Sequence, residues 1–213
     1  MIFLVSIIVS FLLFFAAVTI HEFAHAWAAD KLGDPTPRID GRLTLNPLAH
    51  IDKYGTVLLP LMLTLLRSPL IFGWAKPVIF DPYNLKNPKK DTMLIALAGP
   101  ASNISMAILS SLVLRIFPES LFVQSIFIPF ILLNITLAIF NMVPIHPLDG
   151  GKILVGLLPY RQSHKYDLFL HRYGMYLLIL LILPLWGGNS ILFTYLNPII
   201  RTLSSLLIPY FTI

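Results

Sequence analysis

Long apolar stretches alternate with short polar ones along this chain, and their lengths predict helices. The clearest apolar stretches cover residues 2–29, 91–117 and 121–143. Each is at least as long as the roughly 20 residues that a helix needs to cross a bilayer. The sequence Pro-Glu-Ser at 118–120 predicts a sharp turn between the last two. The pattern therefore predicts membrane-spanning helices rather than half-buried helices of a soluble domain.

Shorter apolar stretches follow a different pattern. Residues 54–72 are interrupted by Pro60, Arg67 and Pro69, which favours a re-entrant segment or hairpin buried against protein over a true span. The remaining apolar stretches, separated by polar or glycine-rich breaks, are 152–158, 175–186 and 191–211. Together these elements predict an all-α polytopic membrane protein, a bundle of about five to six transmembrane or re-entrant helices.

One loop has two interpretations. Between residues 73 and 80, Trp74, Pro77 and Val78 follow a glycine. A small β-hairpin near residues 70–80 would offer an open edge to which an extended peptide could add as a further strand. Alternatively, the segment is an interfacial loop anchored by Trp74. The pattern alone leaves both open.

The composition agrees with a membrane protein. Of 213 residues, 57% are hydrophobic and 12% are charged, whereas soluble domains have about 25% charged residues. We expect one integral membrane domain over 1–213, with core motifs in 1–158 and C-terminal helices in 173–213. The first apolar stretch lacks a basic start and a small-residue cleavage site, so it reads as a retained helix and not a signal peptide.

Charge predicts the orientation in the membrane. The net charge is +5, and most Lys and Arg residues lie in 30–90 and 144–172, while the turn at 118–120 has none. The positive-inside rule therefore places both basic regions in the cytoplasm and the N-terminus outside. No basic helix or aromatic-basic stretch supports nucleic-acid binding. The chain has no cysteine, so a soft metal must bind to His and carboxylate groups.

The sequence His21-Glu22-Phe23-Ala24-His25 closes the first apolar stretch. On a helix, His21 and His25 lie one turn apart on the same face, where both can bind one Zn²⁺ at about 2.0–2.1 Å. Glu22 beside them can act as general base for zinc-bound water. Ionisable groups in a membrane helix are costly and usually functional. The alternative is a pair of interfacial histidines at a helix end.

A catalytic zinc needs three protein ligands and an open position. Asp149 is the best third ligand, because it lies in an apolar segment broken by two prolines and two glycines, over residues 141–151. That break could aim its carboxylate inward. The alternative is an Asx turn or N-cap for a helix that begins near Lys152.

With these candidate zinc ligands, the chain resembles the site-2 protease family of intramembrane zinc metalloproteases. The resemblance rests on three motifs in the expected order, namely His21–His25, Ala98-Gly99-Pro100, and Asn141–Gly151 with its Pro-Leu-Asp-Gly-Gly core. The stretches 45–52 and 73–78 are similar to a small prokaryotic branch without a PDZ or CBS domain. The resemblance implies cleavage of membrane-spanning helices near the cytoplasmic face, with Asp149 as third zinc ligand and Asn141 near the active site.

Other polar residues have competing interpretations. The Asn141 amide could donate to a developing oxyanion or only cap a helix break. Asn103 is expected to hydrogen-bond between helices, and Gly99 to allow close helix packing beside the zinc helix. His50 and His146 could approach the metal or line a polar vestibule. Two more histidines are expected to be solvated in a basic loop over residues 159–172, and they are His164 and His171.

These observations predict a zinc metalloendopeptidase of the membrane, with one Zn²⁺ per chain and transmembrane proteins as substrates. A membrane zinc transporter or sensor without proteolysis is the alternative, but it would need paired polar sites along a pore. A di-iron oxidase or desaturase would need about eight His or carboxylate ligands, and the chain has six histidines, two of them in the basic loop.

Overall fold

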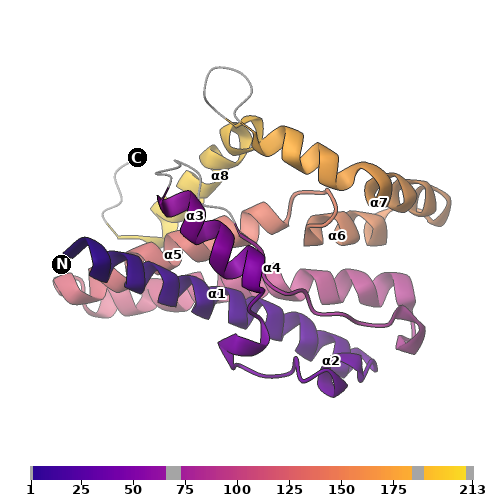
Figure 1. The fold of residues 1–213 in the computed structure, drawn as a ribbon, viewed down its shortest axis with the longest axis horizontal. Coiled ribbons are helices and arrows are strands. Elements are labelled where there is room, and N and C mark those ends of the chain that lie inside the picture. Colours follow the sequence, from indigo (N-terminus) through magenta and orange to yellow (C-terminus); the bar gives the residue numbers. More distant parts are fainter. Residues whose placement is uncertain (1, 66–72, 184–189, 210–213) are drawn as a thin grey trace.

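The computed structural model describes residues 2–65, 73–183 and 190–209, and this part of the chain is helical without β-strands. Figure 1 shows the arrangement of its α-helices, which are α1 Ile2–Leu32, α2 Thr36–Ile39, α3 Leu59–Leu65, α4 Pro88–Ile116, α5 Leu121–Asn141, α6 Asp149–Leu157, α7 Tyr160–Ile182 and α8 Ile191–Leu207. Shorter helical turns, two of 3₁₀ and one of π type, cover Pro47–Ala49, Pro82–Asn84 and Lys53–Leu58.

Three of the described helices, α1, α4 and α5, are long and apolar enough to cross a membrane. Large apolar side chains on their outer surfaces, such as Val5, Leu12 and Leu112, remain more than half exposed in the isolated chain. A helix that is apolar on every side is suited to a lipid environment, because its outer side chains face acyl chains instead of water. The chain is therefore a multi-pass membrane protein.

Helix α4 lies at the centre of the bundle and contacts α1, α5 and α6 (Figure 1). Its apolar contacts with α5 and the end of α8 form one buried cluster, which consists of Ala107, Leu114, Ile131, Ile135 and Ile208. A second cluster, with Ile95 and Ala29 at its centre, packs the start of α4 against the end of α1. This packing brings the His-bearing turn of α1 beside α4.

The loop that follows α1 is held by Asp34, which is fully buried. Its carboxylate accepts hydrogen bonds from the Thr36 hydroxyl at 2.6 Å, the Asp81 N–H at 2.7 Å and the Asn84 amide at 2.8 Å. Burial alone would raise the pKa of Asp34, but these hydrogen bonds outweigh it and lower the pKa. Asp34 thus joins the end of α1 to the segment that leads into α4.

The segment 73–80 is extended but forms no β-strand. The Trp74 N–H donates to the Gly55 carbonyl at 3.1 Å, and the Lys76 N–H donates to the His50 carbonyl at 3.0 Å. The β-hairpin considered near residues 70–80 is therefore absent from residues 73–80, and 70–72 lie outside the described residues. Pro77 lacks an N–H on the opposite edge of the segment, so a further strand could not bond regularly there.

The expected basic loop over 159–172 is wrong, because these residues form the first half of α7. The physical reason is a narrow buried stripe: Ser163, Leu170, Gly174 and Leu178 recur at spacings of seven, four and four and are buried along one side of the helix. Arg161, Lys165 and Arg172 are exposed, whereas Asp167 lies on the stripe itself and is only partly exposed. A mostly polar sequence is typical of a loop, but it is also typical of a surface helix that buries only one narrow stripe.

Two other boundaries differ from the sequence prediction. Helix α6 begins at Asp149 instead of near Lys152, so Asp149 is its first residue. The stretch 54–72 contains the π-type turn and then α3, up to residue 65, while 66–72 lie outside the described residues. Whether this stretch is re-entrant stays a prediction.

Candidate metal centre

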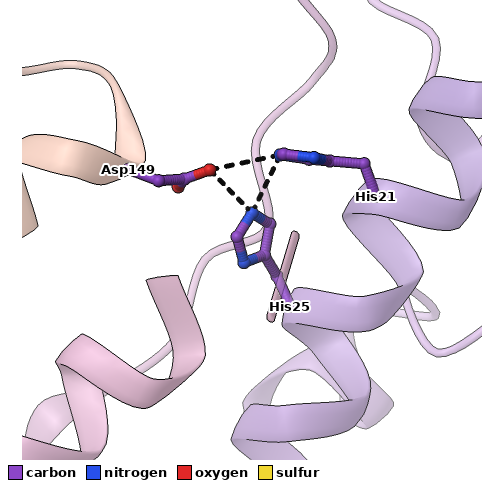
Figure 2. Close-up of side chains that lie close together, drawn as sticks. All are labelled: His21, His25 and Asp149. Carbon is purple, nitrogen blue, oxygen red and sulfur yellow. Dashed lines mark hydrogen bonds and ion pairs between the residues drawn. The ribbon is translucent and has the colours of Figure 1, made fainter. Parts of the chain in front are cut away.

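The two histidines of the His-Glu-x-x-His sequence lie on adjacent turns of α1, as their spacing predicts. Their Nε2 atoms are 3.1 Å apart, and the ring planes are nearly perpendicular, at 85° (Figure 2). Both side chains are buried. Two imidazole nitrogens thus converge on one point beside α4.

Asp149 reaches the same point from α6. Its Oδ2 atom lies 3.2 Å from the His21 Nε2 and 3.3 Å from the His25 Nε2 (Figure 2). Asp149 is buried, and Oδ2 has no hydrogen-bond partner. Leu148 occupies the N-cap position of α6 and makes no side-chain capping bond. The carboxylate is therefore aimed at the histidines.

Two glycines after Asp149 allow its helix to start so close to the preceding loop. A Cβ at Gly150 would collide with the main-chain oxygens of Met142 and Val143. A Cβ at Gly151 would come within 2.7 Å of the His146 Nδ1. Real side chains essentially never come this close, so both positions need glycine for the first turn of α6 to pack against the loop.

Gly99 on α4 is needed for the same reason on the other side of the site. A Cβ there would collide with the His25 Nε2 and with the His21 ring. The predicted close packing of Gly99 against the first helix is confirmed. Because α4 has no side chain at this point, its backbone forms one wall of the metal centre.

Hydrogen bonds to the far ring nitrogens fix both imidazoles. The His21 Nδ1 donates to the Asn103 Oδ1 at 2.6 Å, and the Asn103 amide nitrogen donates to the Asn134 Oδ1 at 2.8 Å. The His25 Nδ1 donates to the main-chain carbonyl of Ile95 at 2.7 Å. With the proton on Nδ1, each neutral ring presents the Nε2 lone pair to the site.

This donor set fits a zinc ion. Three electron-pair donors that face one another without a proton between them repel, so the arrangement is favourable only around a cation. Ligands at about 2.0–2.2 Å from a tetrahedral zinc lie roughly 3.3 Å apart. The observed separations of 3.1, 3.2 and 3.3 Å agree with this value. His21, His25 and Asp149 can thus hold a metal ion.

Glu22 is half-buried on the same turn of α1. Its Oε2 atom accepts a hydrogen bond from the Val78 N–H at 3.2 Å. This contact orients the carboxylate and holds the extended segment 73–80 against α1. Since alternate N–H groups of that segment, at 74, 76 and 78, donate to the protein, the segment is fixed along this side.

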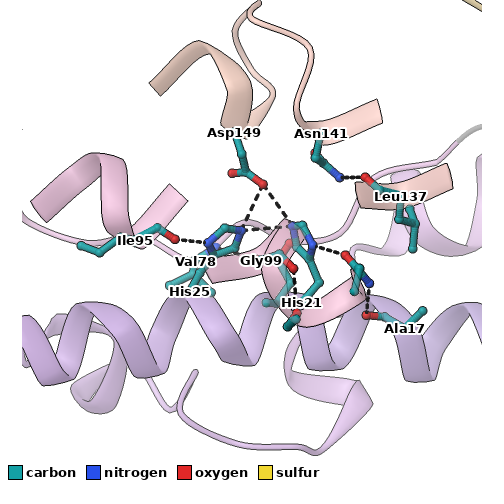
Figure 3. Close-up of polar contacts among 12 residues, drawn as sticks. Ala17, His21, His25, Val78, Ile95, Gly99, Leu137, Asn141 and Asp149 are labelled. Carbon is teal, nitrogen blue, oxygen red and sulfur yellow. Dashed lines mark hydrogen bonds and ion pairs between the residues drawn. The ribbon is translucent and has the colours of Figure 1, made fainter. Parts of the chain in front are cut away.

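The other sequence candidates make contacts of their own. Asn141 is the last residue of α5, and its amide donates to the Leu137 carbonyl at 3.0 Å (Figure 3). The buried ring of His50 is bonded through Nε2 to the Thr44 carbonyl at 2.9 Å. The His146 Nε2 lies 3.3 Å from the Asp167 carboxylate instead. Neither histidine belongs to the group formed by His21, His25 and Asp149.

Buried metal-binding side chains on α1 and α6, inside a bundle of membrane-spanning helices, define the class of a membrane metalloenzyme, and comparison with known proteins specifies it. Residues 119–185 match the model of Peptidase family M50. YwhC of Bacillus subtilis is 33% identical over 208 residues, which cover 91% of this chain and 84% of YwhC. The chain belongs to the M50, or site-2 protease, family, and it is a zinc metalloprotease.

More distant relatives agree. Rip2 of Mycolicibacterium smegmatis is 30% identical over 138 residues, 63% of this chain and 51% of Rip2. MJ0392 of Methanocaldococcus jannaschii is 27% identical over 158 residues, 74% of this chain and 35% of MJ0392. The words zinc metalloprotease occur in the names of YwhC, Rip2 and MJ0392. No solved structure matches the chain.

Replacing Asn103 tests the hydrogen bond behind His21. We expect Asn103→Leu, which keeps the volume but removes the acceptor, to lower zinc affinity by about 10–100-fold, the usual effect of losing an outer-shell partner. Asn103→Asp retains an acceptor oxygen and should restore most of the affinity. Competition with a chromophoric chelator measures both. A folded Asn103→Leu protein with wild-type affinity would show that Asn103 only packs α1 against α4.

Proposed function

We propose that this zinc metalloprotease hydrolyses peptide bonds within or near transmembrane segments of membrane proteins. His21, His25 and Asp149 hold one Zn²⁺ per chain in this proposal. The observation that carries it is the convergence of two imidazoles and a buried carboxylate within 3.3 Å of one another, beside α1 and α4, two helices of membrane-spanning length. One peptidase domain spans residues 1–213.

The protein's own residues provide binding and proton transfer. Zinc, when bound, supplies a Lewis acid that polarises a carbonyl and makes water more acidic. Glu22 accepts a proton from the attacking water and delivers it to the leaving nitrogen. Its hydrogen bond from Val78 supports this role by holding the carboxylate beside the histidines. Asn141 uses one amide proton on Leu137, and its second is proposed to bind the substrate carbonyl.

The proposed substrate must unwind before it is cut. A helix buries its carbonyls in main-chain hydrogen bonds, and breaking these in lipid leaves polar groups unsatisfied. A site near the membrane surface, where water and polar groups are available, reduces that cost. His21 and His25 lie in the C-terminal part of α1, whose apolar span covers Val5–Leu32.

The proposed orientation places this end in the cytoplasm. If the segment between α1 and α4 does not cross, then the C-terminal end of α1, the N-terminal end of α4 and the C-terminal end of α5 share one side. Most Lys and Arg residues lie in the loops and helices on that side, which is typical of cytoplasmic regions. The shorter elements α3, α7 and α8 would complete a bundle of five to six transmembrane or re-entrant helices.

A transporter or sensor without proteolysis is the second candidate function. The family assignment favours the protease. A transporter would need metal-binding groups in succession along the spans. Among the described residues, α4 and α5 contribute no such group, and the second possible metal group involves α7 instead.

Removing zinc tests the proposed function. We expect the purified protein in detergent to cut a model transmembrane substrate, to lose this activity after treatment with a chelator, and to regain it with zinc but not magnesium. The reason is that two imidazoles and one carboxylate select zinc over hard cations. Cleavage is measured by gel electrophoresis and mass spectrometry of the fragments. Undiminished cleavage by protein shown to contain no metal would contradict the proposal.

A further inference from the structure

A second group of metal-binding side chains lies outside the candidate active site. It consists of His146, from the loop before α6, together with Asp167 and His171 of α7. The His146 Nε2 and the His171 Nδ1 each lie 3.3 Å from the Asp167 Oδ1. The two imidazole rings are 4.6 Å apart between centroids. We propose that these three residues form a second zinc site.

The distances and the helix geometry support a metal. Asp167 and His171 are four residues apart on α7, so both side chains lie on one face of the helix. The two separations from the Asp167 oxygen are 3.3 Å, close to the roughly 3.3 Å expected around tetrahedral zinc, and all three ligand atoms lie within 4.8 Å of one another. Two imidazoles with one carboxylate suit zinc or a similar transition metal, whereas magnesium and calcium prefer oxygen ligands.

The site is partly open, unlike the first. His146 is buried, while the Asp167 and His171 side chains are 41% and 69% exposed. The His171 Nδ1 donates to the Asp167 main-chain carbonyl at 3.0 Å. Metal binding at this atom requires the other tautomer, with the proton on Nε2, which costs little on an exposed ring. Solvent can supply the fourth ligand.

The position of His146 gives this site a consequence for the active site. His146 precedes Asp149 by three residues, and its backbone and ring are packed against Gly174 of α7 and Gly151 of α6. A metal bound to His146, Asp167 and His171 therefore joins α7 to the loop that positions the carboxylate of Asp149. The second zinc would hold that loop in place, separately from catalysis.

Zinc stoichiometry of four purified full-length proteins tests the proposal. Each is stripped of metal in detergent, equilibrated with buffered zinc and analysed by mass spectrometry of the metal. We expect two zinc ions per chain for wild type and for His164→Ala, and one each for His171→Ala and His21→Ala. His164 is an exposed histidine of the same helix and controls for binding to surface imidazoles. Because His171 is mostly exposed, its removal leaves the fold intact.

The outcomes separate the two sites. Equal zinc content in wild type and His171→Ala would overturn the second site, whatever the other variants show. Equal zinc content in wild type and His21→Ala would contradict the proposed catalytic centre instead. Hydrogen exchange gives a second measurement. The amides of Val143, Ile145, His146 and Leu148 should exchange more slowly when zinc is added to His21→Ala, but not in a protein that also has His171→Ala.

Discussion

Glu22→Gln is expected to lower cleavage of a transmembrane substrate by about 10²–10⁴-fold while the zinc content stays unchanged. The factor is that of losing a general base. The substitution is nearly isosteric, and the Gln side-chain oxygen still accepts the hydrogen bond that Val78 donates to Glu22 at 3.2 Å. The amide cannot accept a proton from water, so the chemical step alone should be lost.

The chain offers a matched control for this prediction. The sequence contains two glutamates, and the other, Glu119, is exposed in the turn between α4 and α5. Glu119→Gln removes the same charge by the same atomic change and should cut at the wild-type rate. Single-turnover cleavage and metal analysis are measured on both proteins. Wild-type turnover by Glu22→Gln would remove Glu22 from the mechanism.

Periodicity and spacing were sufficient to predict the central features of the fold. The three long apolar stretches correspond to α1, α4 and α5 to within a few residues at each end. An apolar segment of this length can satisfy its backbone hydrogen bonds in lipid only as an α-helix, so the composition alone predicts the secondary structure. The spacing of His21 and His25 likewise determines that both rings lie on one face, whatever the surrounding fold.

The approach of Asp149 depended on tertiary structure. Its motif indicated a broken backbone, but only the packing of α6 against α4 brings the carboxylate within 3.3 Å of the histidines. The hydrogen-bond partners of the rings were harder to foresee. Asn134, bonded to Asn103, was missed, although an isolated amide in an otherwise apolar helix is a usable signal. The Ile95 carbonyl gives no signal in the sequence, because every residue has one.

The error at α7 has a physical cause. Its first half is rich in Arg, His, Lys and Asp, a composition that favours a solvated loop containing His164 and His171. Only one narrow stripe of that half is buried, so hydropathy summed over a window gives little indication of a helix. The consequence is functional, since the helix aligns Asp167 with His171 beside His146, and a loop would not.

Asp149→Asn is expected to lower the zinc content by one equivalent relative to wild type and to abolish detectable cleavage. The amide keeps the volume of the side chain but has no negative charge with which to bind the metal. The loss of affinity should exceed the 10–100-fold typical of outer-shell partners, because a direct ligand is removed. Equilibrium dialysis against buffered zinc measures the content, and the fragment assay measures the activity.

This substitution separates a ligand from a helix cap. Asn stabilises a helix N-terminus about as well as Asp, so a capping role for Asp149 would survive the change, and zinc content and activity would both be retained. Asp40→Asn, at an exposed position beyond α2, removes the same charge far from α6 in the sequence and should match wild type. Retention of full zinc content by Asp149→Asn would leave the histidines without a third ligand from α6, and the proposed centre would have to be abandoned.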